Sequence, residues 1–422
     1  MRTRRSPATP SAAFARPRPL DVLVPQADSL GTVAVIRSLG GAGHRVHAAS
    51  TEPDALGLRS RYAHRAVVSP PYWDPGYVGW LREYVRRHRV SAIVPSESFI
   101  LALGSARPEF LALVPFAADE RTLLDAMSKY ALLENLLARG APHLPPTLLV
   151  PDLRGLPSVD ELHRLGVPLY VKVDACSSLD GRPGVTHCAS SANEARAILF
   201  RLQASYSRAV VQGYVPGQGV GAFFLCARGE VLAELMHRRI HEVPYTGGVS
   251  SLRETWHHGA IRDDALEKLH AARWEGVAMM EYRWDPATHR FAFIEMNARF
   301  WGSLHLALYA GVDFPRLLLD AWQGLPVTIP QPRLGVRCRH FPDEIRHVWS
   351  KFRSPELGFG SKVAAAAGFV ALTFDPRVRG DLWFPGDTGL FWSGLVQFHA
   401  AVKRRLNSRR AFATAELRPP TA

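Results

Sequence analysis

Short apolar runs alternate with helically spaced apolar residues through the first part of the chain. The runs at 21–25, 46–49, 66–69 and 91–95 predict strands, and the spacing at 31–39 and 78–87 predicts helices. Strands that alternate with helices are typical of an α/β fold with a parallel sheet. We therefore predict such a domain at 21–118.

From residue 119 the pattern changes to one long helix, predicted over 119–139 and ended by Gly140, followed by many strands. These strands are predicted at 147–150, 169–173, 209–215, 221–227, 231–239, 278–284 and 290–296. The last two are joined by a predicted hairpin turn at 285–289. We expect 119–330 to be an α+β domain dominated by antiparallel strands.

After Pro330 the composition becomes irregular, which predicts a small C-terminal subdomain at 331–402. Its core is expected to form from four aromatic residues: Trp383, Phe384, Phe391 and Trp392. The longest apolar run, 363–374, is shorter than the ~20 residues that a membrane-spanning helix needs. No transmembrane segment is predicted.

Positive charge is concentrated at the two ends. The chain has 422 residues and a formal net charge of +13, of which residues 1–20 and 403–422 contribute +5 each. We interpret these segments as solvated, disordered basic tails, with at most weak contact to an anionic surface. The remaining sequence carries no nucleic-acid-binding pattern, so no specific nucleic-acid partner is expected.

Several enzyme classes lack their signatures. The loop at 26–31 has no G-x-G-x-x-G for a dinucleotide, and no G-x-S-x-G marks a serine hydrolase. His237 and His241 lack an evident third ligand for zinc. The four cysteines form neither a C-x-x-C pair nor a dense framework, and no apolar secretory signal begins the chain. A cytoplasmic protein is the expectation.

The most informative motif lies on the last predicted strand. Strand alternation points Glu295, Asn297 and Arg299 to one face, and Glu281 lies on the preceding strand. Two carboxylates and an amide oxygen suit Mg²⁺, which prefers hard oxygen ligands, and Arg299 can bind a phosphate or a substrate carboxylate. A surface strand with ordinary polar alternation is the alternative interpretation.

With this motif, residues 119–325 resemble the ATP-grasp superfamily. The sequence Glu-Met-Asn-Ala-Arg at 295–299 is similar to the E-x-N-x-R element of that superfamily, and Glu281 matches the acid one strand earlier. The resemblance implies an N-terminal parallel-sheet α/β domain, an ATP-grasp fold with antiparallel sheets at 119–330, and Glu281, Glu295 and Asn297 as ligands of Mg²⁺, for which Mn²⁺ can substitute.

The resemblance also implies a nucleotide site. Lys172 matches the strand lysine that contacts ATP phosphates, and Lys129 matches an earlier lysine. The implied contacts to adenine and ribose are Gln212, Gly213, Tyr214, Val215 and Gln218, where the superfamily often has acids at the places of Gly213 and Gln218. The segment 177–184 stands where a mobile loop covers the phosphates.

Two arginines complete the implied site. Arg238 and Arg239 lie in a segment similar to bacterial carboxylate–amine ligase-like proteins of unassigned substrate. Their implied role is near the γ-phosphate, and because neighbouring strand residues face opposite ways, only one of them can serve. Arg299 is the third implied catalytic residue.

The function implied is an ATP- and Mg²⁺-dependent ligase that activates a carboxylate as an acylphosphate and joins it to an amine. An ATP-dependent carboxylase that uses bicarbonate, a non-catalytic nucleotide-binding scaffold, and a polyanion-binding module acting through the tails remain alternatives. The sequence does not identify the acid or the amine. A homodimer is the commonest form when such a chain associates.

Overall fold

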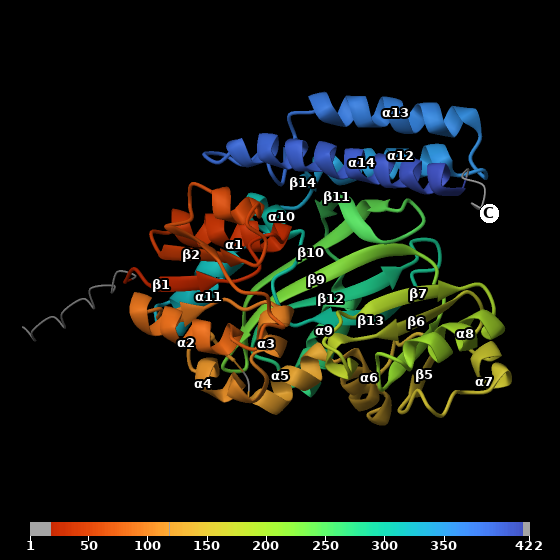
Figure 1. Cartoon of the computed structure of the whole chain (residues 1–422), viewed down its shortest axis with the longest axis horizontal. Coiled ribbons are helices and arrows are strands. Elements are labelled where there is room, and N and C mark those ends of the chain that lie inside the picture. Colours follow the sequence, from red (N-terminus) through yellow and green to blue (C-terminus); the bar gives the residue numbers. More distant parts are fainter. Residues whose placement is uncertain (1–17, 118, 417–422) are drawn as a thin grey trace, which may run out of the picture.

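The computed structural model describes residues 18–117 and 119–416, with side chains up to residue 404. Its first sheet has four parallel strands in the order β3-β2-β1-β4 (Figure 1). Their bounds are Asp21–Val24 (β1), Arg45–Ser50 (β2), Arg65–Val68 (β3) and Ala92–Ile93 (β4). Helices α1 (Leu30–Gly41) and α2 (Tyr77–His88) connect these strands. The predicted parallel α/β fold of this region is confirmed.

Helix α1 joins this domain to the rest of the molecule. A Cβ at Gly31 would lie 2.4 Å from the carbonyl oxygen of Trp301, so the backbone of α1 touches the chain just after β13 (Phe291–Asn297). Trp301 is itself fully buried among aromatic rings, including Phe223 and Phe314. Only glycine permits this approach, because any side chain would collide with backbone.

The largest sheet has seven strands in the order β13-β12-β9-β10-β11-β14-β15. They are β9 (Gln218–Ala227), β10 (Glu230–Val243), β11 (Val249–Thr255), β12 (Gly276–Trp284), β13 (Phe291–Asn297), β14 (Arg337–Arg339) and β15 (Val378–Gly380). All neighbours are antiparallel except β14 and β15. The predicted hairpin between the last two motif strands is therefore present as β12 and β13.

A second antiparallel sheet has the order β5-β8-β6-β7. Its strands are β5 (Thr147–Val150), β6 (Leu169–Val173), β7 (Val185–Ala189) and β8 (Ala209–Gly213), with helices α7 (Val159–His163) and α8 (Ala192–Leu202). Leu169, Val171 and Val173 of β6 pack into the core with α8. Alternation leaves Lys172 on the opposite face.

The single helix predicted over 119–139 is wrong. The structure has two helices, α5 (Glu120–Met127) and α6 (Lys129–Ala138), separated at Ser128. Ser128 is extended, and its hydroxyl accepts a hydrogen bond from the Ala131 amide, so it caps α6. The break makes Lys129 the first residue of α6. Other helices are α3 (Glu97–Ala102), α4 (Arg107–Leu111), α9 (Gly259–Ala271), α10 (Leu304–Ala310) and α11 (Phe314–Trp322).

The C-terminal part adds a layer of helices: α12 (Phe341–Arg353), α13 (Phe359–Phe374) and α14 (Gly389–Glu416) (Figure 1). Helix α12 packs on β10 and β11, and β14 and β15 extend the seven-stranded sheet. Helix α14 continues past residue 403, where a basic tail was predicted. The tail residues 1–17 and 417–422 lie outside the described part, and the division at 330 stays a prediction.

The aromatic core predicted for this part is only partly realised. Phe391 contacts Trp383 and Trp392 edge-on, but the two tryptophans are 51% and 60% exposed. Among the described residues, no helix is both long and apolar enough to cross a membrane.

Candidate functional site

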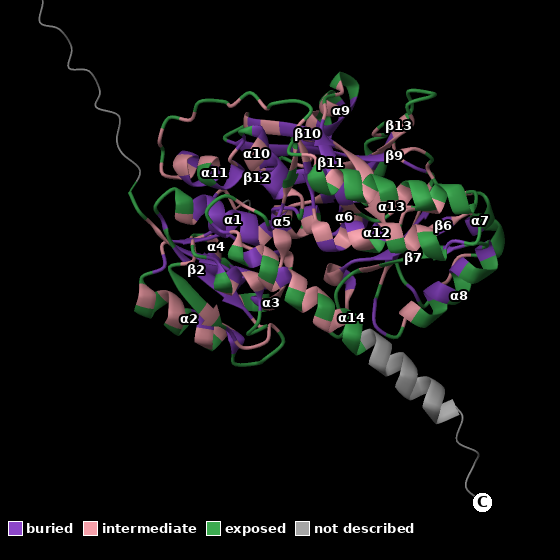
Figure 2. Cartoon of the chain, turned by 90° about the horizontal axis from the view of Figure 1, so that it is seen from above, coloured by how far each residue is buried: buried purple, intermediate pink, exposed green. Residues whose placement is uncertain are grey.

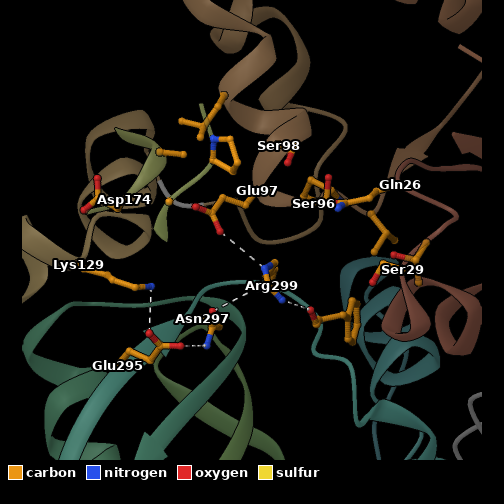
Figure 3. A pocket seen from close by; sticks show the side chains of 18 of the residues that line it. Gln26, Ser29, Ser96, Glu97, Ser98, Lys129, Asp174, Glu295, Asn297 and Arg299 are labelled. Carbon is orange, nitrogen blue, oxygen red and sulfur yellow. Dashed lines mark hydrogen bonds and ion pairs between the residues drawn. The ribbon is translucent and has the colours of Figure 1, made fainter. Parts of the chain in front are cut away.

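A cavity of about 420 Å³ opens where the two antiparallel sheets and the N-terminal domain meet (Figure 3). Polar side chains line it from three directions. The N-terminal domain contributes Gln26, Ser29, Ser96, Glu97 and Ser98; β6, β7 and their connection contribute Asp174 and Thr186; and β13 and the residues after it contribute Glu295, Asn297 and Arg299. A site with walls from separate parts of the fold can close on a ligand between them.

Two carboxylates stand side by side at the edge of the large sheet. Glu281 of β12 is the register partner of Glu295 of β13. The Asn297 side-chain amide donates hydrogen bonds to both, with Nδ2 at 3.3 Å from Oε1 of Glu281 and 3.2 Å from Oε1 of Glu295. The structure thus brings together the three side chains predicted as metal ligands.

Lys129 neutralises one of these carboxylates. Its Nζ lies 3.0 Å from Oε2 of Glu295. Burial alone would lower the pKa of the Lys129 ammonium, but the charge and hydrogen bond of Glu295 outweigh burial and raise it. Burial likewise opposes ionisation of Glu295, yet the charges of Lys129 and Lys172 lower its pKa to about 2. Both groups are therefore charged at neutral pH.

Lys172 is the more exceptional cation. It is only 6% exposed, and no hydrogen bond or ion pair joins its ammonium to another described residue. Burial lowers its pKa to about 8, against the favourable charge of Glu295 and with added repulsion from Lys129. A buried ammonium without a direct partner is costly in free energy, and a bound anion would compensate that cost.

The two predicted arginines lie on opposite faces of β10. Arg239 forms an ion pair with Glu281, and its Nη1 lies 3.3 Å from Oε1 of Glu242. Arg238 instead pairs with Glu254 at 2.6 Å, on the other side of the sheet. Only Arg239 therefore joins the carboxylate cluster.

Arg299 connects this cluster to the N-terminal domain. Its Nη2 donates to Oδ1 of Asn297 at 3.4 Å, and its Nε lies 3.8 Å from Oε2 of Glu97 (Figure 3). Glu97 is the first residue of α3, whose N-cap is Ser96. A guanidinium and a carboxylate thus face one another inside the cavity.

The predicted adenine segment follows the end of β8. Gln212 is buried and donates to the Thr147 hydroxyl at 3.2 Å, while its Oε1 has no hydrogen-bond partner among the described residues. Tyr214 is exposed and Val215 half-buried. A Cβ at Gly213 would lie 2.1 Å from the Leu165 carbonyl oxygen. That contact explains why no acid stands at this position.

Gln218, at the expected ribose position, donates from its side-chain amide to the Arg239 carbonyl oxygen. The side chain is thus held against the backbone of β10, next to the arginine that joins the carboxylate cluster. Gln212 and Gly213 end β8, Tyr214 and Val215 follow it, and Gln218 begins β9. Their contact with a nucleotide remains a prediction.

The donor chemistry fits a hard cation that shares its ligands with phosphate. No group of three or more His, Cys, Asp or Glu that could hold a metal ion occurs in the described ranges 18–117 and 119–416. Glu281, Glu295 and the Asn297 amide oxygen supply too few oxygens to complete an octahedral shell. Mg²⁺ or Mn²⁺ would fit here with further ligands from bound phosphates or water.

The sequence interpretation missed the wall contributed by the N-terminal domain. Gln26 and Ser29 follow β1, and Ser96, Glu97 and Ser98 follow β4. The rule that ligands bind at the carboxyl ends of parallel strands could have identified them.

Asp174 was also missed. It accepts hydrogen bonds from the Tyr130 amide at 3.3 Å and from the Ser128 hydroxyl at 3.1 Å, so it fixes the start of α6. No local sequence signal links Asp174 to residues 44 and 46 positions earlier.

Comparison with solved structures relates this fold to known enzymes. The ADP complex of an N5-carboxyaminoimidazole ribonucleotide synthetase matches with a TM-score of 0.60 and 13% identity, over 85% of this chain and 98% of that chain. The L-amino acid ligase from Bacillus licheniformis matches with a TM-score of 0.54 and 16% identity, over 73% of this chain and 75% of that chain. Biotin carboxylase from Campylobacter jejuni matches with a TM-score of 0.55 and 13% identity, over 75% of this chain and 74% of that chain.

At these identities the likeness establishes the fold. The chain has the architecture of ATP-grasp proteins, which confirms the fold that the motif resemblance implied. No protein-family model and no curated protein sequence matches the chain.

Proposed function

We propose that this protein is an ATP- and Mg²⁺-dependent ligase that joins a carboxylate to an amine through an acylphosphate. The observation that carries the proposal is the cluster at the cavity: Glu281, Glu295 and Asn297 side by side, with Lys129 and the buried Lys172 next to them. Such a set suits the polyphosphate of a nucleotide, because it offers cations to phosphate oxygens and carboxylates to a metal.

The chemistry has two steps. In the first, a carboxylate oxygen of the substrate attacks the γ-phosphorus of ATP, the bond to the bridging oxygen breaks, and ADP leaves with the electron pair. In the second, the amine nitrogen attacks the acyl carbon, a C–N bond forms, and inorganic phosphate leaves. The nitrogen also loses a proton.

The side chains of the cavity and of the carboxylate cluster beside it divide these tasks. Lys129, Lys172 and Arg239 stabilise charge on the phosphoryl oxygens, and Lys129 and Arg239 do so after they leave their carboxylate partners Glu295 and Glu281. Arg299 binds the substrate carboxylate or the developing oxyanion. Glu97, opposite Arg299, is placed to accept the proton of the amine.

Glu281, Glu295 and Asn297 would hold the metal. When bound, Mg²⁺ supplies Lewis-acid stabilisation of the phosphate charge. Because Lys129 and Arg239 now pair with these two carboxylates, metal binding would free both cations to turn toward phosphate.

A second candidate is an ATP-dependent carboxylase, in which bicarbonate takes the place of the organic acid. The observation in its favour is the 98% coverage of an N5-carboxyaminoimidazole ribonucleotide synthetase. The cluster serves either acid, because the same groups activate any carboxylate that reaches the γ-phosphorus.

ADP release from Mg-ATP over a matrix of carboxylic acids and amines, with bicarbonate as one of the acids, tests the proposal. ADP formation that requires both an organic acid and an amine supports the ligase. Formation that requires bicarbonate supports the carboxylase. A wild-type protein that binds Mg-ATP but releases no ADP across a broad matrix would favour the scaffold interpretation.

A further inference from the structure

Helix α13 (Phe359–Phe374) has no buried residue, although it is almost wholly apolar. It forms the outermost part of the C-terminal layer, and the burial colours show it only as intermediate or exposed (Figures 1 and 2). A helix that is apolar on all sides is normally covered by protein or by lipid. Its apolar surface is therefore larger than a monomer in water would leave uncovered.

The large exposed apolar residues of α13 share one face. Phe359, Val363, Val370 and Phe374 fall within about 60° of one another at 3.6 residues per turn. Phe359 and Phe374 are 82% and 80% exposed. The helix thus presents a continuous apolar stripe about 24 Å long, at a rise of 1.5 Å per residue.

A groove of about 610 Å³ runs between α12, α13 and α14 and continues the apolar surface. Its walls include Trp349, Phe352, Phe369, Phe398 and Val402. Trp349 is 63% exposed. Two arginines, Arg346 and Arg353, also line it.

Basic residues outnumber acidic ones in this layer of helices. From the start of α12 to residue 404 the sequence has eight Lys and Arg residues and six acidic ones. Three of the acids, Glu344, Asp381 and Asp387, are buried, so they do not offset the exposed basic residues. Two of the basic residues, Arg346 and Arg377, pair with Asp343 and Asp375. The layer that carries the apolar stripe therefore has a net basic surface.

The apolar stripe together with the basic residues indicates what covers this surface. In a twofold dimer each subunit would present the same basic residues to its copy, and they would repel. An anionic lipid surface attracts the basic residues and accepts aromatic and aliphatic side chains at the headgroup level. We propose that α12, α13 and the first part of α14 dock this protein on the surface of an anionic bilayer, with the α13 stripe immersed and its helix axis along the surface.

Vesicle co-sedimentation of the full chain tests this proposal. The vesicles are phosphatidylcholine alone, or phosphatidylcholine with about one quarter phosphatidylglycerol. We expect binding to the anionic vesicles and a loss of at least about tenfold in the partition coefficient for the double variant Phe359→Ser/Phe374→Ser. The control is Trp73→Ser, which removes an equally exposed aromatic side chain of the N-terminal domain, 82% exposed, and should bind like wild type.

Four results would overturn the proposal. The first is a wild type that does not bind anionic vesicles, and the second is a double variant that binds as well as wild type, which would assign binding to the basic tails. The third is a Trp73→Ser control that loses binding as the double variant does. The fourth is a wild-type dimer in size-exclusion light scattering that the double variant converts to a monomer. Near-ultraviolet circular dichroism of the double variant checks that it remains folded. The ADP-release assay without vesicles is a separate readout, so failure of docking and failure of the proposed ligase activity are distinguishable.

Discussion

Nζ of Lys129 lies 3.0 Å from Oε2 of Glu295, and this ion pair connects the first residue of α6 to β13, the edge strand of the large sheet. The same carboxylate is the register partner of Glu281 and accepts a hydrogen bond from Asn297. Cation and carboxylates are thus assembled from sequence positions more than 150 residues apart before any nucleotide arrives.

Arg238 and Arg239 offer a matched pair of neighbours. Arg239 pairs with Glu281, whereas Arg238 pairs with Glu254 on the other face. We expect Arg239→Ala to lower ATP turnover by about 10²- to 10³-fold, because a cation that stabilises the phosphate charge is lost. Arg238→Ala should stay within about threefold, since it removes a partly exposed ion pair. Equal losses in steady-state kinetics would contradict the assignment.

ATP binding should take up a proton at Lys172. Burial lowers the pKa of this lysine to about 8, so at pH 8.5 about three quarters of the free protein has it neutral. Bound phosphates favour the charged form, and uptake of up to about 0.7 proton follows. Titration calorimetry in buffers of different ionisation enthalpy measures it. Lys172→Met should show no such uptake, and unchanged uptake in that variant would contradict the role.

The same lysine makes stability depend on pH. Its folded-state pKa is lowered from 10.5, so between about pH 8 and 10.5 the unfolded chain binds a proton that the folded chain does not. The contribution of Lys172 to the free energy of unfolding therefore rises with pH across this window. Urea denaturation of the protein and of Lys172→Met at several pH values should differ in slope there.

Asp174 should act through Lys129. Asp174→Ala removes acceptors for the Tyr130 amide and the Ser128 hydroxyl, so we expect a stability loss of about 1–2 kcal/mol and a higher KM for ATP. Asp119→Ala is the control, because Asp119 is the N-cap of α5 and accepts a hydrogen bond from the Thr122 amide. It should lose stability and leave the KM unchanged. A KM that rises equally in both variants would show a general effect of destabilisation.

Gly213 is expected to be required by backbone geometry. Gly213→Ala would place a Cβ 2.1 Å from the Leu165 carbonyl oxygen, so the chain must shift, at a cost of about 1–3 kcal/mol. Gly259→Ala is the control, since no atom lies within 4 Å of its added Cβ, and it should stabilise α9 slightly. Thermal unfolding compares the two. If Gly213→Ala does not change the thermal stability, backbone geometry does not explain why this position has glycine instead of an acid.

The sequence predicted helices and strands well where the spacing of apolar residues within an element determines its structure. The β12–β13 hairpin and the parallel strands followed directly from alternation and apolar runs. The break at Ser128 did not, because apolar spacing continues through it and its cause is a cap fixed by Asp174, a distant residue. Likewise, the composition after residue 330 did not predict α13, whose apolar residues are not in a core.

In the candidate site, too, local patterns predicted some residues, whereas others depend on tertiary packing. Glu281, Glu295 and Asn297 could be placed together because strand alternation and one hairpin determine their faces. The choice between Arg238 and Arg239 needed the register of β10 against its neighbours. Glu97 could not be paired with Arg299 from sequence, because that contact depends on how the N-terminal domain packs against the large sheet.

Titration calorimetry with a non-hydrolysable ATP analogue tests the central claim, because it needs no knowledge of the acid or the amine. We expect Mg²⁺-dependent binding by the wild type, an affinity at least about tenfold lower in Lys172→Ala, and no Mg²⁺ dependence in Glu295→Gln. The controls Lys351→Ala on α12 and Glu230→Gln, an exposed carboxylate at the start of β10, should bind like wild type. A wild-type protein that binds no nucleotide, or variants that bind as tightly as it does and with the same Mg²⁺ dependence, would contradict the account.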